Sequence, residues 1–476
     1  MMGLRTEATR LRDEHGRHRV FHGINLVAKG NRRPTGSYVD RGFRGTWTAD
    51  DIADLAARGL TLVRLGILWA AVEPEPGRYD EEYLDWVGSQ LDLIGAAGMF
   101  AFLDAHQDLY SQAFEDGAPA WATLTDHEYA ATEPWSDAYL SSPAVHEALD
   151  RFWENAPGPG GVGLQDRFAA MWGHVAARFR GHPALIGYDL LNEPAPGSAA
   201  SGIVAALMGA FAQATGQDLD ELLADLGDPE ARFAQLRRLE EEAVHRRIGD
   251  AAHPSVAGFE AGSVAPLMAR VAAVVRRVDP EALLLREHGY FANLGVPSGQ
   301  PPLDDQNWVY SPHGYDLTVD TAAISRSSDI RAATIFARHA ETAERLGVPV
   351  IVGEWGGMGL ATGIARHARS LLDLFDARGW SWTYWCWQDG FADSEAAAVV
   401  VRPRPVAFAG DGLSWRVADG ALHARWRGAE TGAPSVFFAP EGTAEVLRDG
   451  AAFPARREGS WITVPAGVGD YELTVG

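Results

Sequence analysis

Leu185-Ile186-Gly187-Tyr188-Asp189-Leu190-Leu191-Asn192-Glu193-Pro194 is the stretch of sequence that decides the fold. It is a short apolar run that ends in polar residues, as a buried parallel strand does where it reaches a functional face. Seven similar apolar runs occur along the chain, with helical segments between them. The predicted strands are residues 20–26, 61–68, 99–105, 185–191, 282–287, 308–313, 348–354 and 380–387. Eight strands that alternate with helices predict an α/β fold, the (β/α)8 TIM barrel.

Two connections are much longer than the usual two to six residues. Residues 106–163 follow the third strand and are rich in aromatic side chains, and residues 195–254 follow the fourth strand. Loops on the carboxyl side of barrel strands belong to the active-site face. We therefore expect both segments to form walls of a substrate cleft.

The sequence pattern changes after the last predicted strand. From about residue 398 onward, short alternating runs are separated by turn residues such as Asp449-Gly450. This pattern predicts a small antiparallel β-sandwich. We expect a catalytic barrel over residues 1–395 and a C-terminal β-sandwich domain over residues 398–476.

Composition excludes several classes of function. The 476 residues carry 41 Lys and Arg against 64 Asp and Glu, a net charge of −23, which repels nucleic acid. Cys386 is the single cysteine, so no intrachain disulfide can form. The sequence contains no apolar run of about 18 residues, so it predicts no membrane span. The first 19 residues lack the apolar core of a signal peptide, so we expect a secreted monomer whose signal lies outside this sequence.

Two glutamates follow predicted strands on opposite sides of the barrel. Glu193 ends the fourth strand and Glu354 ends the seventh, in Val352-Gly353-Glu354-Trp355. Glycoside hydrolysis uses two carboxyl groups, one as acid/base and one as nucleophile or base. A single glutamate here could be an ordinary residue of the barrel rim, but the paired placement favours catalysis.

Further motifs carry a resemblance to a known family. Asn192-Glu193-Pro194, Arg64, His313-Gly314-Tyr315 and Glu354 together resemble glycoside hydrolase family 5. The segment Leu103-Asp104-Ala105-His106-Gln107-Asp108-Leu109-Tyr110-Ser111 resembles the endoglycoceramidases, including the endogalactosylceramidase type. The resemblance covers about residues 15–395.

The resemblance implies roles for the catalytic residues. Glu193 is expected to be the acid/base and Glu354 the nucleophile of a retaining double displacement, with the two carboxyls roughly 5–5.5 Å apart. Asn192 is expected to bind the 2-hydroxyl of the sugar. Arg64 is expected to keep Glu354 ionised, because a nearby cation favours the charged form.

The remaining predicted residues surround the first sugar. Tyr315 is expected to orient Glu354, and His313 to face the leaving-group side. His106, Asp108 and Lys29 are expected to bind sugar hydroxyls, although Lys29 could be a solvated side chain. Trp385 is expected to form a platform under the ring. The basic stretch of residues 31–33 departs from the endoglycoceramidase pattern, so the preference for glucose or galactose stays open.

The sequence contains no motif that is typical of a metal site or a cofactor site. No His-Glu-x-x-His occurs, and the first strand carries His22-Gly23-Ile24 instead of the His-x-His of a metal-dependent barrel. The sequence also lacks the Gly-x-Ser-x-Gly nucleophile elbow, which is the motif of α/β-hydrolase lipases. We expect no metal and no cofactor.

The leading hypothesis is a retaining endo-glycosidase that releases the intact glycan from a glycosphingolipid and leaves ceramide. Residues 110–153, with Met358-Gly359-Leu360, are expected to supply an apolar wall for the lipid. The alternatives are an exo-acting glucosylceramidase or β-glucosidase, an endo-β-glucanase, and a non-catalytic glycolipid-binding protein. Peripheral contact with membranes or micelles is also expected. It could involve C-terminal aromatics such as Trp415, Trp426, Phe437 and Trp461, which are more simply the core of the sandwich.

Overall fold

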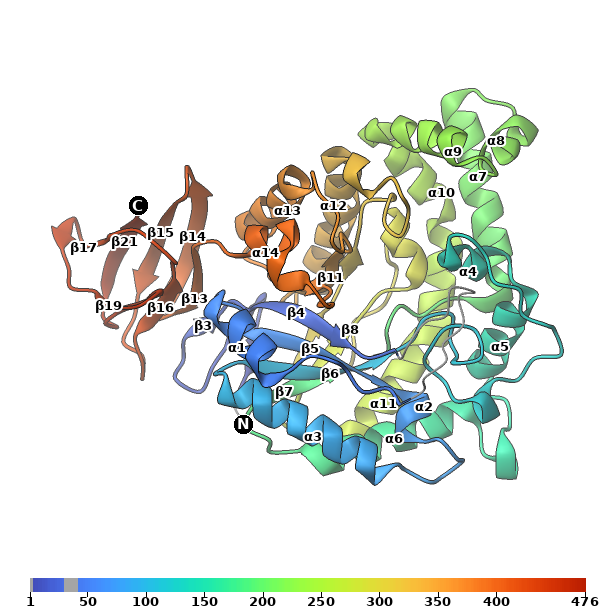
Figure 1. Ribbon diagram of the computed structural model, residues 1–476, viewed down its shortest axis with the longest axis horizontal. Coiled ribbons are helices and arrows are strands. Elements are labelled where there is room, and N and C mark those ends of the chain that lie inside the picture. The colour runs from blue at the N-terminus through green and yellow to red at the C-terminus, as the bar shows by residue number, and fades with distance from the viewer. Residues whose placement is uncertain (1–2, 30–41) are drawn as a thin grey trace.

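A closed barrel of parallel strands forms the centre of the computed structural model, which describes residues 3–29 and 42–476 (Figure 1). The strands are β4 (His22–Val27), β5 (Leu62–Leu68), β6 (Phe100–His106), β7 (Leu185–Asp189), β8 (Leu283–Arg286), β9 (Trp308–Tyr310), β10 (His313–Gly314), β11 (Ile351–Gly356) and β12 (Ser381–Trp385). They pair in the order β10-β11-β12-β4-β5-β6-β7-β8-β9. A parallel bridge between Tyr310 and Val350 closes the ring. The predicted barrel is therefore confirmed, with the sixth strand divided into β9 and β10.

Helices cover the outside of the barrel. The outer layer contains α1 (Ala49–Ala57), α3 (Glu81–Ala96), α6 (Leu164–Phe179), α11 (Ala265–Val278), α12 (Asp329–Leu346) and α13 (Ala365–Arg378). The side chains of Thr48, Asp80 and Ser328 accept hydrogen bonds from backbone N–H groups in the first turns of α1, α3 and α12. These caps fix where each helix begins, so the following strand returns to the barrel in register.

The two long connections stand at the carboxyl ends of the strands. The first contains α4 (Ala138–Ser141) and α5 (Pro143–Trp153). The second contains α7 (Ala200–Thr215), α8 (Leu219–Asp225), α9 (Pro229–Leu236) and α10 (Glu242–Phe259), which rise beside the barrel at the upper right of Figure 1. These four helices share an apolar core that includes Ile203, Phe211 and Leu222. Helical segments Gly197–Thr215 and Glu242–Val278 reach the length and mean hydropathy of a membrane span, a test that core helices also pass.

The C-terminal part of the chain forms two antiparallel sheets. Its strands are β13 (Arg404–Phe408), β14 (Gly410–Ala418), β15 (Ala421–Gly428), β16 (Ser435–Phe438), β17 (Ala444–Arg448), β18 (Ala451–Ala452), β19 (Arg456–Glu458), β20 (Trp461–Val464) and β21 (Gly469–Val475). Trp415, Trp426 and Phe437 are buried between the sheets, and Trp461 packs edge-on against Phe438. Trp415, Trp426 and Phe437 therefore belong to the core of the domain, as the simpler interpretation expected. Trp461 does not, because it lies on the face of β20 opposite the core residues Ile462 and Val464.

The first strands of the chain join this C-terminal domain. Strands β1 (Arg5–Glu7), β2 (Arg10–Arg12) and β3 (His18–Arg19) extend one of its sheets, and Phe408 of β13 pairs with His18 of β3. The chain enters β4 directly from β3, so the domain lies at the amino-terminal ends of the barrel strands (Figure 1). The long connections lie at the opposite end, which separates this domain from the candidate site.

Candidate active site

Arg64 is the electrostatic centre of the barrel mouth. Its side chain projects from β5 and is fully buried. Among the described residues, its guanidinium forms ion pairs with four carboxylates: Asp104 at 2.9 Å, Asp189 at 3.1 Å, Glu287 at 2.8 Å and Glu354 at 2.5 Å. Burial alone would lower the pKa of Arg64, but these carboxylates raise it well above its ordinary value. The arginine is therefore a fixed cation that binds several strands together.

Sequence reasoning named Arg64 and Glu354 but missed the other three carboxylates. Asp189 ends β7 and Glu287 directly follows β8, whereas Asp104 lies two residues before the end of β6. Each is an acidic residue at or near the end of an otherwise apolar run, which is a sequence signal for an inward-facing polar group. A barrel that places them around one arginine could have been inferred from that signal, because carboxylates are rarely buried without a partner.

Glu354 lies at the base of the site and is held from three sides. Arg64 Nη1 donates to its Oε1, and the Tyr315 hydroxyl donates to its Oε2. His313 Nδ1 lies 3.5 Å from Oε2. Burial raises the pKa of Glu354 above its ordinary value, whereas His313 and Arg64 oppose the rise. The expected placement of Arg64 and Tyr315 beside Glu354 therefore agrees with the geometry.

Glu193 follows β7 in a left-handed backbone conformation with φ of 38°. Such a conformation is strained for a residue with a side chain and needs support from its surroundings. The backbone N–H of Glu193 donates to Glu287 Oε2 at 2.8 Å. Its carboxylate Oε1 accepts from Asn293 Nδ2 at 2.7 Å and contacts His313 Nδ1 at 2.9 Å. Asn293 and Glu287 were not anticipated from the sequence.

The distance between the two glutamates indicates a type of chemistry. One carboxylate oxygen of Glu193 and one of Glu354 lie within 4.8 Å of each other and of a His313 nitrogen. In retaining glycosidases the two carboxyls are about 5–5.5 Å apart, whereas inverting enzymes leave about 6.5–9.5 Å for a water molecule. The separation fits a nucleophile and an acid/base that act on the same sugar carbon.

His313 is fully buried between these acids. Its Nε2 lies 3.2 Å from Glu287 Oε1, on the side of the ring away from Glu193. Burial would lower the pKa of His313, but Glu287 and Glu354 raise it well above its ordinary value. Although burial would raise the pKa of Glu287, His313 and Arg64 lower it to about 2. The neighbouring acids therefore favour the protonated form of His313 beside Glu193, and its expected role toward the leaving group stays a prediction.

The predicted sugar-binding residues also come together. Lys29 forms an ion pair with Asp108, and its Nζ lies 3.4 Å from Asp116. His106 bonds Asp104 at 2.9 Å and stacks on Trp385 with ring centroids 5.2 Å apart. Burial and Lys29 would lower the pKa of His106, but Asp104 raises it to about 10. The stretch after Lys29, residues 31–33, lies outside the described residues.

Asn192 is placed by hydrogen bonds on both ends of its amide. Its Oδ1 accepts from Arg64 at 2.8 Å, and its Nδ2 donates to the carbonyl of Gln107 at 2.9 Å. Gln107 in turn donates to the carbonyls of Asn192 and Glu193. Gln107 is a further residue that sequence reasoning did not assign, and it ties the segment after β6 to the segment after β7 that carries Glu193.

A cleft of about 500 Å³ opens above these residues. Its polar lining includes the predicted residues Lys29, His106, Asp108, Asn192, Glu193, Tyr315, Glu354 and Trp385. Arg64 and His313 do not line it, because they lie beneath the glutamates. The apolar lining comes largely from the second long connection, with Leu207, Met208, Phe211, Leu222, Leu226, Leu236, Leu239 and Ile248. The cleft is therefore polar at the glutamates and apolar toward α7–α10.

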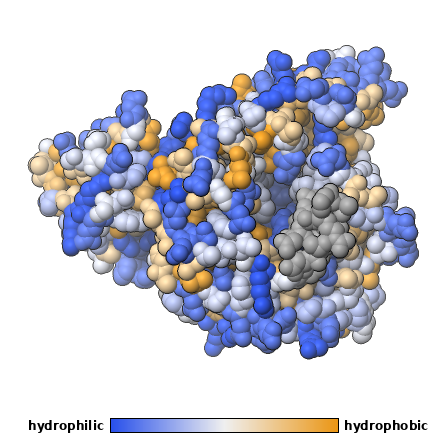
Figure 2. Space-filling view, in the orientation of Figure 1, coloured by the Kyte–Doolittle hydropathy of each residue, from blue (hydrophilic) through white to orange (hydrophobic). Residues whose placement is uncertain are grey.

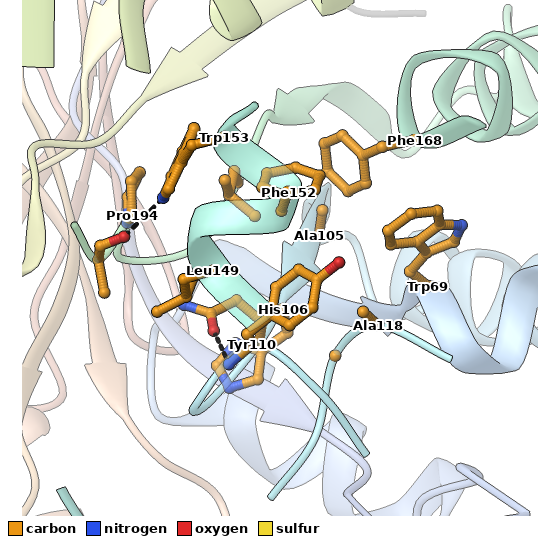
Figure 3. Close-up of a pocket in the computed structure, with 14 residues that line it drawn as sticks. Trp69, Ala105, His106, Tyr110, Ala118, Leu149, Phe152, Trp153, Phe168 and Pro194 are labelled. Atoms are coloured by element: carbon orange, nitrogen blue, oxygen red, sulfur yellow. Dashed lines mark hydrogen bonds between the residues drawn. The ribbon is translucent and has the colours of Figure 1, made fainter. Parts of the chain in front are cut away.

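The expected apolar wall from residues 110–153 is largely wrong. Tyr110, Phe152 and Trp153 point into a separate small chamber behind His106, together with Trp69 and Phe168 (Figure 3). Met358 is buried and does not line the cleft. From the first connection, Trp135 and Leu140 do reach the cleft. Its other aromatics fill the core because the segment must cover the barrel end before it can form a wall.

The outer surface gives no comparable apolar area in the view of Figure 2. Hydrophilic side chains dominate that face, and hydrophobic side chains appear in small separate groups. Exposed single apolar residues are normal on soluble proteins.

The fold and this site define a class. A (β/α)8 barrel with two glutamates at the ends of its fourth and seventh strands, within 4.8 Å and held by a buried arginine, has the arrangement of a retaining glycosidase. Residues 35–390 match the cellulase family, glycosyl hydrolase family 5. The chain belongs to that family.

Individual relatives narrow the comparison. Endoglycoceramidase I of Rhodococcus hoagii is 35% identical over 196 residues, which cover 41% of this chain and 37% of that protein. The chain thus matches well under half the length of this relative. Endo-glycoceramidase II from Rhodococcus sp., solved as a ganglioside GM3 complex, superposes with a TM-score of 0.74 at 26% identity over 98% of this chain and 99% of the other. An endogalactoceramidase shares the fold at 23% identity, with a TM-score of 0.66 and 99% of each chain covered.

Proposed function

We propose that the protein is a retaining endo-glycosidase that hydrolyses the β-glycosidic bond between the glycan and the ceramide of glycosphingolipids. The observation that carries the proposal is the division of the cleft: the glutamate pair lies where its polar part meets its apolar part. A sugar bound over Trp385 on one side and a lipid against α7–α10 on the other would place the bond between them at Glu193. The similarity to endoglycoceramidases supports this substrate class.

The geometry accommodates a double displacement. Glu354 attacks the anomeric carbon of the first sugar, and the carbon–oxygen bond to ceramide breaks as Glu193 gives its proton to the departing oxygen. This step leaves a glycosyl ester on Glu354 and free ceramide. Glu193, now ionised, removes a proton from water, whose oxygen attacks the same carbon and releases the glycan with retained configuration. Arg64 and Tyr315 stabilise the Glu354 carboxylate when it leaves again.

The sugar-binding side needs groups that donate and accept hydrogen bonds. Lys29, His106 and Asp108 present a cation, an imidazole and a carboxylate along one wall, and Trp385 offers an aromatic face. We infer that this wall binds the hydroxyls of the first sugar, while Asn192 approaches its 2-hydroxyl. Peripheral contact with a membrane or micelle also belongs to the proposal, because a ceramide substrate resides there.

Product analysis tests the proposed function. Lactosylceramide incubated with the protein is expected to yield intact lactose and ceramide, which mass spectrometry distinguishes from a released monosaccharide. Proton NMR of the first product is expected to show the β-anomer. Glucose released from glucosylceramide alone would favour the exo-acting alternative, and cleavage of cello-oligosaccharides alone would favour an endo-β-glucanase. If none of these substrates gave a product, the result would contradict the proposal and favour a non-catalytic glycolipid-binding protein.

The apolar wall predicts a lipid-specific defect. Leu226→Asp places a charge in the apolar lining of the cleft. It is expected to raise KM for short-chain lactosylceramide about tenfold, because burying a leucine side chain is worth about 1.5–3 kcal/mol. Hydrolysis of 2,4-dinitrophenyl β-lactoside, which lacks the lipid, is expected to stay unchanged. Steady-state kinetics on both substrates measure the difference.

Leu223→Asp is the matched control, since Leu223 lies on the same turn but is 48% exposed and does not line the cleft. It is expected to leave both substrates unaffected in solution. An equal effect of the two variants on short-chain lactosylceramide would contradict a lipid site inside the cleft. A defect of Leu223→Asp confined to liposomal substrate would instead locate contact with the bilayer at α8.

A further inference from the structure

Asn293 contacts Glu193 from a segment that follows β8. It lies in η7 (Tyr290–Leu294), a turn beyond the end of the fifth barrel strand, and is buried. Its Nδ2 donates to Glu193 Oε1 at 2.7 Å. His313 Nδ1 approaches the same oxygen at 2.9 Å. In the part of the chain that the structure describes, both side chains that contact the carboxyl group of Glu193 at hydrogen-bonding distance thus contact the same oxygen, Oε1.

This arrangement determines which oxygen of Glu193 can carry a proton. An oxygen that accepts from an amide N–H and lies 2.9 Å from an imidazole nitrogen acts as an acceptor, so in the carboxylic acid the proton is expected on the other oxygen. The side chain retains 9% exposure and lines the cleft, so the oxygen left for the substrate is Oε2. A proton on Oε2 faces the glycosidic oxygen, whereas a proton on Oε1 would face away from it.

The turn that carries Asn293 is held from behind. Glu260, in the π-helical turn η6 (Glu260–Val264), is fully buried and accepts from Gly289 N at 2.8 Å and Gly299 N at 2.5 Å. These two residues flank η7 on either side. His245 Nε2 bonds the carbonyl of Leu294 at 2.9 Å. Single π-helical turns occur often at functional sites, and this one fixes both ends of the segment.

The same turn is tied to the catalytic segment itself. Tyr290 N donates to the carbonyl of Pro194, the residue after Glu193, at 2.8 Å. A side chain that positions a catalytic group must have its own position determined by packing and hydrogen bonds. Asn293 meets this condition through Glu260, His245 and Pro194.

We propose that Asn293 is a positioning residue for proton donation, which holds Glu193 so that its Oε2 delivers the proton to the leaving group. The inference rests on the proposed function, in which Glu193 is the acid/base. This role predicts that loss of Asn293 slows bond cleavage only in substrates whose leaving group needs a proton. A dinitrophenolate is weakly basic and leaves without a proton. The alkoxide of an alcohol such as ceramide is strongly basic and needs a proton in order to leave.

The test compares leaving groups within one glycan. The values of kcat/KM are measured for 2,4-dinitrophenyl β-lactoside, octyl β-lactoside and short-chain lactosylceramide with wild type, Asn293→Ala and Asn293→Leu. Both variants are expected to lose about 10- to 100-fold on the alkyl and ceramide substrates, in the range that misplacing an acid catalyst costs. On the dinitrophenyl substrate they are expected to stay within about threefold of wild type, since no proton is required.

Three controls separate the outcomes. The rate at which 2,4-dinitrophenyl 2-deoxy-2-fluoro-β-lactoside labels Glu354 is expected to match wild type and shows that the nucleophile is intact. Asn155→Ala, an asparagine that caps the start of α6 through Gln165 N, is expected to leave the ratio between substrates unchanged. Glu193→Gln is expected to show the same leaving-group dependence as the Asn293 variants, but larger.

The outcomes are distinguishable. If Glu193→Gln shows the dependence and both Asn293 variants lose activity equally on every substrate, or on none, the inference about Asn293 is overturned. If Glu193→Gln itself treats octyl and dinitrophenyl lactosides alike, the acid/base assignment in the proposed function fails first. Asn293→Leu keeps the branched shape and the number of heavy atoms of the native side chain, so it tests the loss of the amide if Asn293→Ala loosens the turn.

Discussion

Glu354→Gln is expected to lower kcat/KM on lactosylceramide by about 10⁴-fold or more, because the amide cannot form the glycosyl ester. The substitution removes one negative charge but keeps the shape of the side chain. Arg64 still pairs with Asp104, Asp189 and Glu287. The fold is therefore expected to persist, as circular dichroism and the melting temperature would show. Release of ceramide, followed by mass spectrometry, measures the loss.

Glu193→Gln gives the paired result. It is expected to abolish turnover of lactosylceramide to a similar extent, because ceramide is a poor leaving group without a proton. With 2,4-dinitrophenyl β-lactoside, glycosylation of Glu354 still proceeds, and added azide is expected to restore turnover by attacking the intermediate without base assistance. Hydrolysis of lactosylceramide near the wild-type rate by either glutamine variant would contradict the assignment of the two glutamates.

Arg64→Met is expected to destabilise the protein by about 3–5 kcal/mol, the cost of removing one partner from a buried ion pair. Methionine fills much of the space but leaves Asp104, Asp189, Glu287 and Glu354 without their shared cation. Activity is expected to fall more than about 100-fold, since Glu354 loses the contact that favours its ionised form. Urea unfolding monitored by tryptophan fluorescence measures the stability.

The pH dependence of this defect has a definite sign. Burial already raises the pKa of Asp189 and of Glu354 above ordinary carboxyl values. Without Arg64 these pKa values rise further, so the folded variant binds more protons than its unfolded chain. The contribution of these carboxyl groups to its stability is then greatest at low pH and falls as the pH rises above the ordinary carboxyl range of about 4. The difference in unfolding free energy between variant and wild type is expected to widen from about pH 5 to about pH 8.

A surface arginine provides the comparison. Arg178 pairs with Asp85 across α6 and α3, and its side chain is 43% exposed. Arg178→Met is expected to change stability by less than about 1 kcal/mol at any of these pH values, as exposed ion pairs contribute little. A defect of Arg64→Met that is equally small, or that shows no trend with pH, would contradict the view of Arg64 as the cation shared by buried acids.

Much of the barrel could be predicted from the sequence because its strands are buried on both faces. All the apolar runs found between residues 20 and 387 correspond to barrel strands of the structure. The sixth run is interrupted at Ser311-Pro312, where proline cannot donate to the ladder, and this explains its division into β9 and β10. The pair of glutamates proposed as catalytic could be predicted because each lies at or just beyond the carboxyl end of such a run.

The partners of Glu193 could not be predicted in the same way. Asn293 reaches it from a turn 100 residues away, and its role depends on the path of a segment without regular periodicity. Glu287 lies after an apolar run, so its inward direction was predictable, but its bond to the backbone of Glu193 depends on the left-handed conformation of that residue. Such contacts depend on tertiary structure.

The location of the apolar wall was also beyond sequence reasoning. Residues 110–153 contain more aromatics, but large aromatic groups are what a connection uses to cover the end of a barrel. The helices α7–α10 carry smaller apolar residues on faces that pack partly on one another and partly on the cleft. Periodicity identifies an apolar helical face but not what that face contacts.

The pairing of β3 with β13 has a practical consequence for shortening the chain. A cut near residue 398 would remove β13 and leave the strands before β4 with an open hydrogen-bonding edge and the apolar residues beneath it uncovered. Exposed edges of this kind promote association between molecules. A smaller enzyme is thus better sought by trimming both ends of the polypeptide together, and a reporter fused at the carboxyl terminus would lie on the side of the molecule remote from incoming substrate.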